Sequence, residues 1–292
     1  MNLHGKPARV GHHCGSSTYT ATREVVDFYE DALDDHSPLY REVAPPLLHH
    51  SECYRFLGEW YLHNLIGNLH AQQDWEMFEA IPVGTQIRTR STIVDRYHKR
   101  GRDYVVNETD VVAADDGRLF VRGRTHQSFL ATSQKASDGF VVDAGTAKKK
   151  EPRPPFPTAT GEDLAPVRKT IDARRCWMFS GPGRNYHTDA AEAQKLGFPG
   201  IVVQGMMTTC FAAQVMTDRF GRGFLAGGRM SLKLTNVVWE NDALTARARI
   251  ARIEPEGVHE RVHCEVWVEK DDATRVLIGT ASALRPGEAA AA

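Results

Sequence analysis

The chain has 292 residues, of which 41% are hydrophobic and 25% charged, and its 36 Lys and Arg residues nearly balance 37 Asp and Glu residues. A chain of this length can bury one large or two modest domains, and its balanced charge creates no global field that favours nucleic acid or an anionic membrane. No apolar run reaches the roughly 18 residues of a membrane-spanning helix, and MNLHGKPARV lacks the pattern of a secretory signal. We expect a soluble, cytoplasmic protein with no nucleic-acid or membrane partner.

The five cysteines are scattered, odd in number and never in a CxxC pair. This usage argues against both a disulfide framework and a zinc site. We therefore expect reduced, mostly buried thiols, with no metal and no cofactor.

Two segments of the first half have the composition of helices. REVVDFYEDAL (23–33) is the shorter, and SECYRFLGEWYLHNLIG (51–67) is long and apolar on more than one face. A helix that is apolar all round is typically buried, so 51–67 is predicted to lie in the core. The pair His49-His50 precedes it and is either the entry to that helix or the remnant of a second site.

Strand-like runs follow over 81–130, where apolar and polar residues alternate in three stretches separated by charged or glycine turns. The next stretch, 132–166, carries three consecutive lysines and a proline cluster. We interpret it as a polar, partly extended crossover.

The second half repeats this order. The stretch 189–197 is predicted to be a short helix that opens with a capping box from Asp189 to Glu192, and GMMTTCFAAQVMTDRF (205–220) a second long buried helix. Three strand-like runs over 236–285 echo those of 81–130.

The turn residues of the two copies keep the same spacing. Asp115 and Asp271 lie in equivalent turns. The number of residues from Asp115 to Asp271 equals the number from Gly123 to Gly279. Two copies at so long a period indicate a duplicated domain, since solenoid repeats are about 20–50 residues long.

The stretch SGPGRNYHTD (180–189) places a histidine between a bend and a helix start. Glycine and proline at 181–183 favour the bend. The long helix over 205–220 should begin with the free amides of Gly205 and Met206, which suit a carbonyl oxygen that becomes negative. A general base, His187, beside such donors is the minimum equipment for chemistry at the carbon next to a carbonyl.

The order SG…N…H-x-D…A…GF…I…x-G-M over 179–207 resembles the MaoC-like hydratases and dehydratases, which include (R)-specific enoyl-CoA hydratases. The resemblance is strong over 176–285 and weaker over 10–130. It implies an α+β double hot dog, with two long buried helices each wrapped by an antiparallel sheet, and one continuous sheet. The implied domains are a degenerate hot dog over 1–131, a linker over 132–166 and a catalytic hot dog over 167–292.

Carried over residue by residue, the resemblance makes His187 the catalytic histidine, Asn185 the motif asparagine, and Gly205 or Met206 the carbonyl-binding amide. The neighbouring residues expected to contact substrate are Arg184, Tyr186, Gln204 and Met206. From the residues alone, Asn185 either orients substrate or stabilises its turn, and Arg184 faces either a ligand anion or solvent.

One departure from the family is that Pro182-Gly183 stands where an aspartate usually follows the SG pair. The family uses that aspartate, with the histidine, to hold the water. Its absence leaves three alternatives, which are a one-base mechanism on His187, a carboxylate from elsewhere, or no hydration chemistry. Asp189 is the nearest carboxylate, and its capping position favours a structural role.

The resemblance therefore implies a hydro-lyase that adds water to, or removes it from, the α,β position of an acyl thioester linked to CoA or a carrier. It is also compatible with a homodimer. Three rivals stay open. They are an acyl-binding subunit without catalysis, an enzyme redirected to a substrate without CoA, and a thioester hydrolase.

Overall fold

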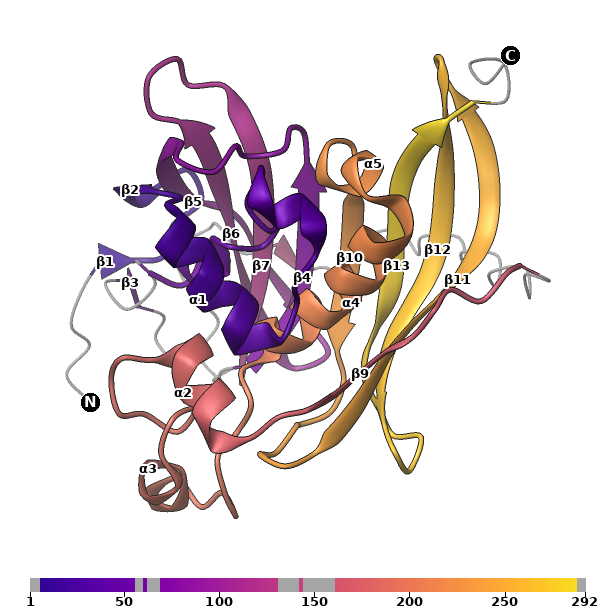
Figure 1. Ribbon diagram of the computed structural model, residues 1–292. Coiled ribbons are helices and arrows are strands. Elements are labelled where there is room, and N and C mark those ends of the chain that lie inside the picture. Colours follow the sequence, from indigo (N-terminus) through magenta and orange to yellow (C-terminus); the bar gives the residue numbers. More distant parts are fainter. Residues whose placement is uncertain (1–5, 56–59, 62–68, 131–141, 144–160, 288–292) are drawn as a thin grey trace.

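The computed structural model describes residues 6–55, 60–61, 69–130, 142–143 and 161–287, and the structural account concerns these residues. Their dominant feature is an eleven-stranded sheet with helices on one side (Figure 1). Along the sheet the order is β2-β5-β6-β7-β4-β10-β13-β12-β11-β9, and β8 pairs with β5 off this path.

The main strands of the first half are β2 (His13–Thr20), β4 (Leu69–Met77), β5 (Gln86–Lys99), β6 (Arg102–Ala113) and β7 (Leu119–Leu130). Those of the second half are β9 (Val167–Thr170), β10 (Arg229–Leu234), β11 (Ala243–Glu256), β12 (His259–Lys270) and β13 (Arg275–Pro286). The short strands are β1 (Lys6–Pro7), β3 (Trp60–Tyr61) and β8 (Val142–Asp143).

The strands follow the same order from each edge of the sheet towards its centre. Strands β2, β5, β6, β7 and β4 correspond in order to β9, β11, β12, β13 and β10, and the copies join where β4 pairs with β10 in antiparallel fashion. The duplicated domain and the single continuous sheet are thus confirmed.

Gly123 and Gly279, which the sequence placed in turns, lie instead within the equivalent strands β7 and β13, where both permit close approach. A Cβ at Gly123 would lie 2.5 Å from Cζ3 of Trp75, and one at Gly279 would lie 2.1 Å from the Ser231 carbonyl oxygen. Any side chain there would push neighbouring strands or core residues apart.

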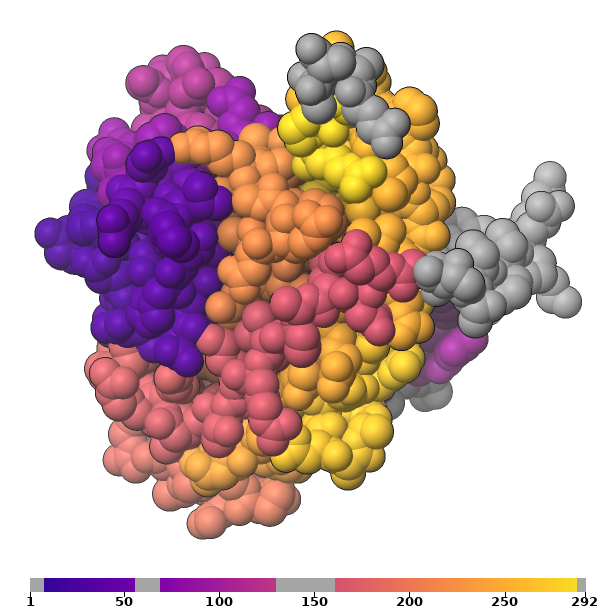
Figure 2. Space-filling view, turned by 45° about the vertical axis from the view of Figure 1, so that its right-hand side comes forward, coloured from indigo at the N-terminus to yellow at the C-terminus, as the bar shows by residue number. Residues whose placement is uncertain are grey.

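Helix α4 (Gly205–Phe220) is the central helix of the second half and has the predicted bounds. Eleven of its residues are buried, and it packs on β11, β12 and β13. A helix that is apolar on every face is stable only when other elements cover it, as they do here. Figure 2 shows the indigo residues of the first half directly beside the orange segment of the second, so the copies share one core.

The other helices are α1 (Arg23–Leu33), α2 (Ala173–Ser180), α3 (Ala190–Lys195) and α5 (Arg222–Leu225), with 3-10 turns η1 (Pro38–Arg41) and η2 (His50–Cys53). Helix α1 matches its prediction, packs on α2 and α4, and donates a hydrogen bond from Tyr29 Oη to Cys210 Sγ at 3.2 Å. Helix α3 opens at Asp189, whose side chain accepts from the Glu192 amide at 3.0 Å, as the capping box predicted.

The long buried helix predicted over 51–67 is wrong in the part of this segment that the structure describes. Residues His50–Cys53 form one 3-10 turn, and Trp60–Tyr61 is a strand parallel to β1. Residues 56–59 and 62–68 lie outside the described part. An apolar run fits a buried helix and a buried strand equally well by periodicity, so tertiary packing decides between them.

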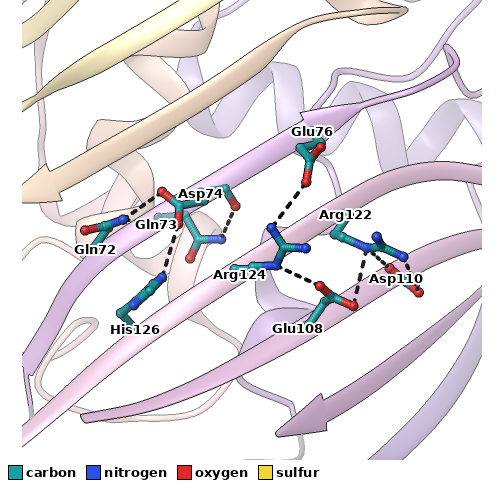
Figure 3. Close-up of polar contacts among 9 residues, drawn as sticks. All are labelled: Gln72, Gln73, Asp74, Glu76, Glu108, Asp110, Arg122, Arg124 and His126. Atoms are coloured by element: carbon teal, nitrogen blue, oxygen red, sulfur yellow. Dashed lines mark hydrogen bonds and ion pairs between the residues drawn. The ribbon is translucent and has the colours of Figure 1, made fainter. Parts of the chain in front are cut away.

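The outer face of the first half of the sheet is polar (Figure 3). Arg122 Nε lies 2.7 Å from Asp110 Oδ1, and Arg124 Nε lies 2.7 Å from Glu108 Oε2. Cross-strand pairs of this kind each contribute modestly to stability, because solvent screens them.

All five cysteines are buried free thiols, as predicted. No helix within the described ranges is long and apolar enough to cross a bilayer. The crossover expected over 132–166 lies mostly outside the described residues, and β9 begins at Val167.

Candidate active site

The bend after α2 is held by Asn185. Its Oδ1 accepts from the His187 amide at 2.8 Å, and its Nδ2 lies 3.3 Å from the Gly183 carbonyl. Thr188 Oγ1 accepts from the Asn185 amide at 2.9 Å. This local pattern is that of an Asx turn, so the structure gives Asn185 a turn-stabilising role, and its contact with substrate stays a prediction.

Arg184 and Asp189 form an ion pair at the surface. Arg184 Nη2 lies 2.8 Å from Asp189 Oδ2, and the Arg184 side chain is 72% exposed. Since Asp189 also caps α3, its carboxylate is engaged on both oxygens. Among the described residues, no carboxylate hydrogen-bonds to the His187 ring.

The His187 ring is anchored to the segment that leads into α4. Its Nδ1 lies 2.7 Å from the Val202 carbonyl oxygen, and Val202 precedes Gly205 by three residues. A carbonyl only accepts, so Nδ1 carries the proton and Nε2 presents a lone pair. Burial lowers the pKa of His187, and the bond to Val202 partly opposes that shift. The ring is therefore a neutral base near pH 7.

Tyr186 packs against this base. The two ring centroids are 4.0 Å apart, and Phe198 lies 6.0 Å beyond Tyr186. Burial raises the pKa of Tyr186, so its hydroxyl stays protonated.

The head of α4 has free donors. Gln204 is the N-cap residue and makes no side-chain capping bond. The amides of Gly205 and Met206 have no acceptor among the residues that the structure describes. A Cβ at Gly205 would lie 2.1 Å from Leu234 Cδ2, so a glycine is needed for this approach to β10. Free amides and the helix dipole favour an oxygen that gains negative charge.

Sequence reasoning missed two residues of the first half, His70 and Tyr54, which form a pair near the head of α4. His70, on β4, has its Nδ1 2.6 Å from Tyr54 Oη and 3.7 Å from the Cβ position of Gly205. His70 follows the wrongly predicted helix, and nothing in the residue pattern singles it out.

His49 and His50 lie in the core. His50 stacks on Phe179 with centroids 4.0 Å apart, and His49 meets the edge of Trp75 at 5.6 Å. Burial lowers the pKa of His49 to about 3 and that of His50 to about 4, so both rings are neutral. His50 begins η2, which fits an entry to a helical turn better than a second site.

A duplicated five-strand unit, one continuous sheet and a buried central helix define a double hot dog protein. The sequence of residues 156–272 matches the MaoC like domain. Residues 156–272, the greater part of the second half, thus resemble a MaoC-like domain.

Solved structures support the architecture over nearly the whole chain. One described as a MaoC-like dehydratase is 17% identical, covers 94% of this chain and 98% of its own, and has a TM-score of 0.74. A MaoC-like dehydratase from Phytophthora capsici is 13% identical over 93% of this chain and 95% of its own, with a TM-score of 0.68. At these identities the likeness shows the fold alone.

A third structure is a conserved hypothetical protein from Mycobacterium tuberculosis with a double hot dog fold. It is 13% identical, covers 92% of this chain and 94% of its own, and has a TM-score of 0.61. Curated proteins include no match to the sequence.

Proposed function

We propose that the protein is a hydro-lyase that hydrates the α,β double bond of an acyl thioester, or catalyses the reverse dehydration. The observation that carries the proposal is the bond from His187 Nδ1 to the Val202 carbonyl. It fixes the tautomer whose Nε2 can take a proton, and it ties this base to the segment that opens α4.

The proposed hydration needs one base. His187 Nε2 takes a proton from water as the water oxygen bonds to the β-carbon, and the electron pair of the double bond moves onto the thioester oxygen. The amides of Gly205 and Met206 hold that enolate oxygen, and Gln204, Tyr186 and Arg184 border the substrate. His187 then returns the proton to the α-carbon.

The division of labour in this proposal follows the expected domains. The second hot dog, 167–292, carries His187 and α4, while the first, 1–131, completes the sheet and the core, with 132–166 as the linker. We also propose a cytoplasmic enzyme that uses a CoA or carrier-linked substrate and forms a homodimer, which light scattering on the purified chain will test.

The principal alternative is an acyl-binding protein without catalysis. Pro182-Gly183 stands in the place of the family aspartate, and within the described residues no other carboxylate reaches the His187 ring. This alternative predicts tight binding of acyl-CoA without turnover.

The test is a panel of trans-2-enoyl-CoA and 3-hydroxyacyl-CoA compounds of increasing chain length, followed by the absorbance of the conjugated thioester. Wild-type turnover and a loss of roughly 100-fold or more in His187→Ala are expected, because a positioned base contributes that much. His36→Ala, at a half-exposed site just after the C-terminal end of α1, is the control. Turnover by His187→Ala within about threefold of wild type would refute the assignment of the base.

A further inference from the structure

His70 faces the interior because β4 contains a bulge. The β4–β7 register pairs His70 with Gln127 and Gln72 with His126, and it leaves Ala71 without a partner. Strict alternation would turn His70 to the outer face, where Gln72 and His126 lie (Figure 3). The extra residue re-aims the His70 side chain inward, which is a recurring use of bulges near functional sites.

The inward ring lies against the first residue of α4. His70 Nδ1 is 3.7 Å from the position of a Cβ on Gly205, and Tyr54 Oη is 2.6 Å from the same nitrogen. A histidine and a tyrosine of the first half thus meet the helix start of the second half.

The protonation of this pair follows from burial. Burial lowers the pKa of His70 to about 4 and raises the pKa of Tyr54 well above its usual value, so both groups are neutral near pH 7. Within the described residues, Tyr54 Oη has no other acceptor. The phenol therefore donates to Nδ1, and the imidazole proton resides on Nε2.

This Nε2–H is a donor without an acceptor. It is shielded from solvent, and no acceptor in the described part of the chain lies within hydrogen-bond distance, although the Gln73 side chain and the Gln72 backbone lie near enough to the ring to oppose the lowering of its pKa. Buried polar groups are almost always paired, so an orphan donor on a ring that lies against Gly205, the first residue of α4, indicates a missing oxygen. A carbonyl oxygen can accept more than one hydrogen bond, and a neutral imidazole of depressed pKa is suited to polarise it.

We propose that His70 is a catalytic residue that donates a hydrogen bond from Nε2–H to the thioester oxygen at the head of α4. Tyr54 is a positioning residue that holds the required tautomer of His70. The proposal rests on the hydro-lyase function proposed above, to which it adds a third donor contributed by the degenerate first half. His70 transfers no proton and strengthens its hydrogen bond as negative charge develops on the oxygen.

The kinetic test compares His70→Ala and His70→Gln with wild type on the best enoyl-CoA of the panel. Loss of one such donor lowers kcat by roughly 100-fold or more with little change in KM. His70→Gln keeps an N–H near the Nε2 position and should recover about tenfold of that loss. His126→Gln is the matched control, because His126 bonds to Asp74 on the outer face of the neighbouring strand.

If wild type turns over the panel and the kcat of His70→Ala stays within about threefold of wild type, the role of His70 is overturned. The hydro-lyase function itself is not contradicted by that result. If wild type neither turns over the panel nor binds butyryl-CoA by calorimetry, the hydro-lyase fails, and the role of His70 falls with it. Thermal unfolding checks that each variant is folded.

Nitrogen NMR of 15N-histidine-labelled protein gives a readout that packing alone would not move. The His70 signals, assigned by their loss in His70→Gln, should show a neutral Nε2–H ring at pH 7, and this proton should shift when unreactive butyryl-CoA binds. Tyr54→Phe should give a mixture of tautomers and a smaller loss of kcat. A charged ring at pH 7, or an unmoved Nε2–H with butyryl-CoA bound, would overturn the proposal even where His70→Ala does not fold.

Discussion

Asp35 is a buried carboxylate that makes the stability of the fold depend on pH. It lies after α1 and is 4% exposed, and Tyr40 Oη donates to its Oδ2 at 3.0 Å. Its Oδ1 has no partner among the described residues. Burial is the largest cause that raises the pKa of Asp35 from 3.8 to about 7, and the charge of Asp218 adds to it, while the bond from Tyr40 opposes it.

The direction of the effect on stability follows from this shift. Between the two pKa values the folded state binds a proton that the unfolded state has released, so stability falls as pH rises from 3.8 to about 7. One pKa unit corresponds to about 1.4 kcal/mol, which makes the full loss about 4 kcal/mol, as an order of magnitude. Below pH 3.8 this contribution is fully present.

Replacement of Asp35 by Asn should remove this dependence. The amide oxygen can still accept from Tyr40, and no charge forms at any pH. Urea unfolding at pH 5 and pH 8 should show that Asp35→Asn gains a few kcal/mol relative to wild type as pH rises. Asp34→Asn is the matched control, since Asp34 is adjacent, its side chain is 52% exposed and its left-handed backbone suits asparagine. An equal stability difference at both pH values would contradict the burial argument.

Two further predictions concern the base and the sheet. Because burial lowers the pKa of His187 from its ordinary 6.5, kcat/KM should rise with pH through an inflection below pH 6.5 and then level off, and an inflection above 7 in initial rates would contradict the neutral base. Gly279→Ala should destabilise the protein by about 2 kcal/mol or more, because its Cβ would meet the Ser231 carbonyl at 2.1 Å. Urea unfolding measures this, with Gly183→Ala as the comparison, since a Cβ at Gly183 has no neighbour within 4 Å and its φ is not positive.

The parts that the sequence predicted well are those in which local and tertiary signals agree. Helix α4 is apolar on every face and lies between Gly205 and Gly221, and a helix of this kind is stable only when it is buried. The capping residue Asp189 marks the start of α3 directly, and the equal spacing of the pairs Asp115/Asp271 and Gly123/Gly279 indicated the duplication. The segment 51–67 lacks such boundaries, and its apolar residues do not distinguish helix from strand.

His70 lay beyond prediction for a different reason. The alternation of β4 assigns His70 to the outer face, and only the unpaired Ala71 reverses that assignment. A bulge depends on the partner strand, so a single strand sequence carries no sign of it. The second half alone provides His187 and the α4 amides, whereas an orphan donor at the same helix start comes from the first half. His49 and His50 of the same half also have unpaired buried nitrogens, and His70 differs from them in its place, because its ring lies against the first residue of α4.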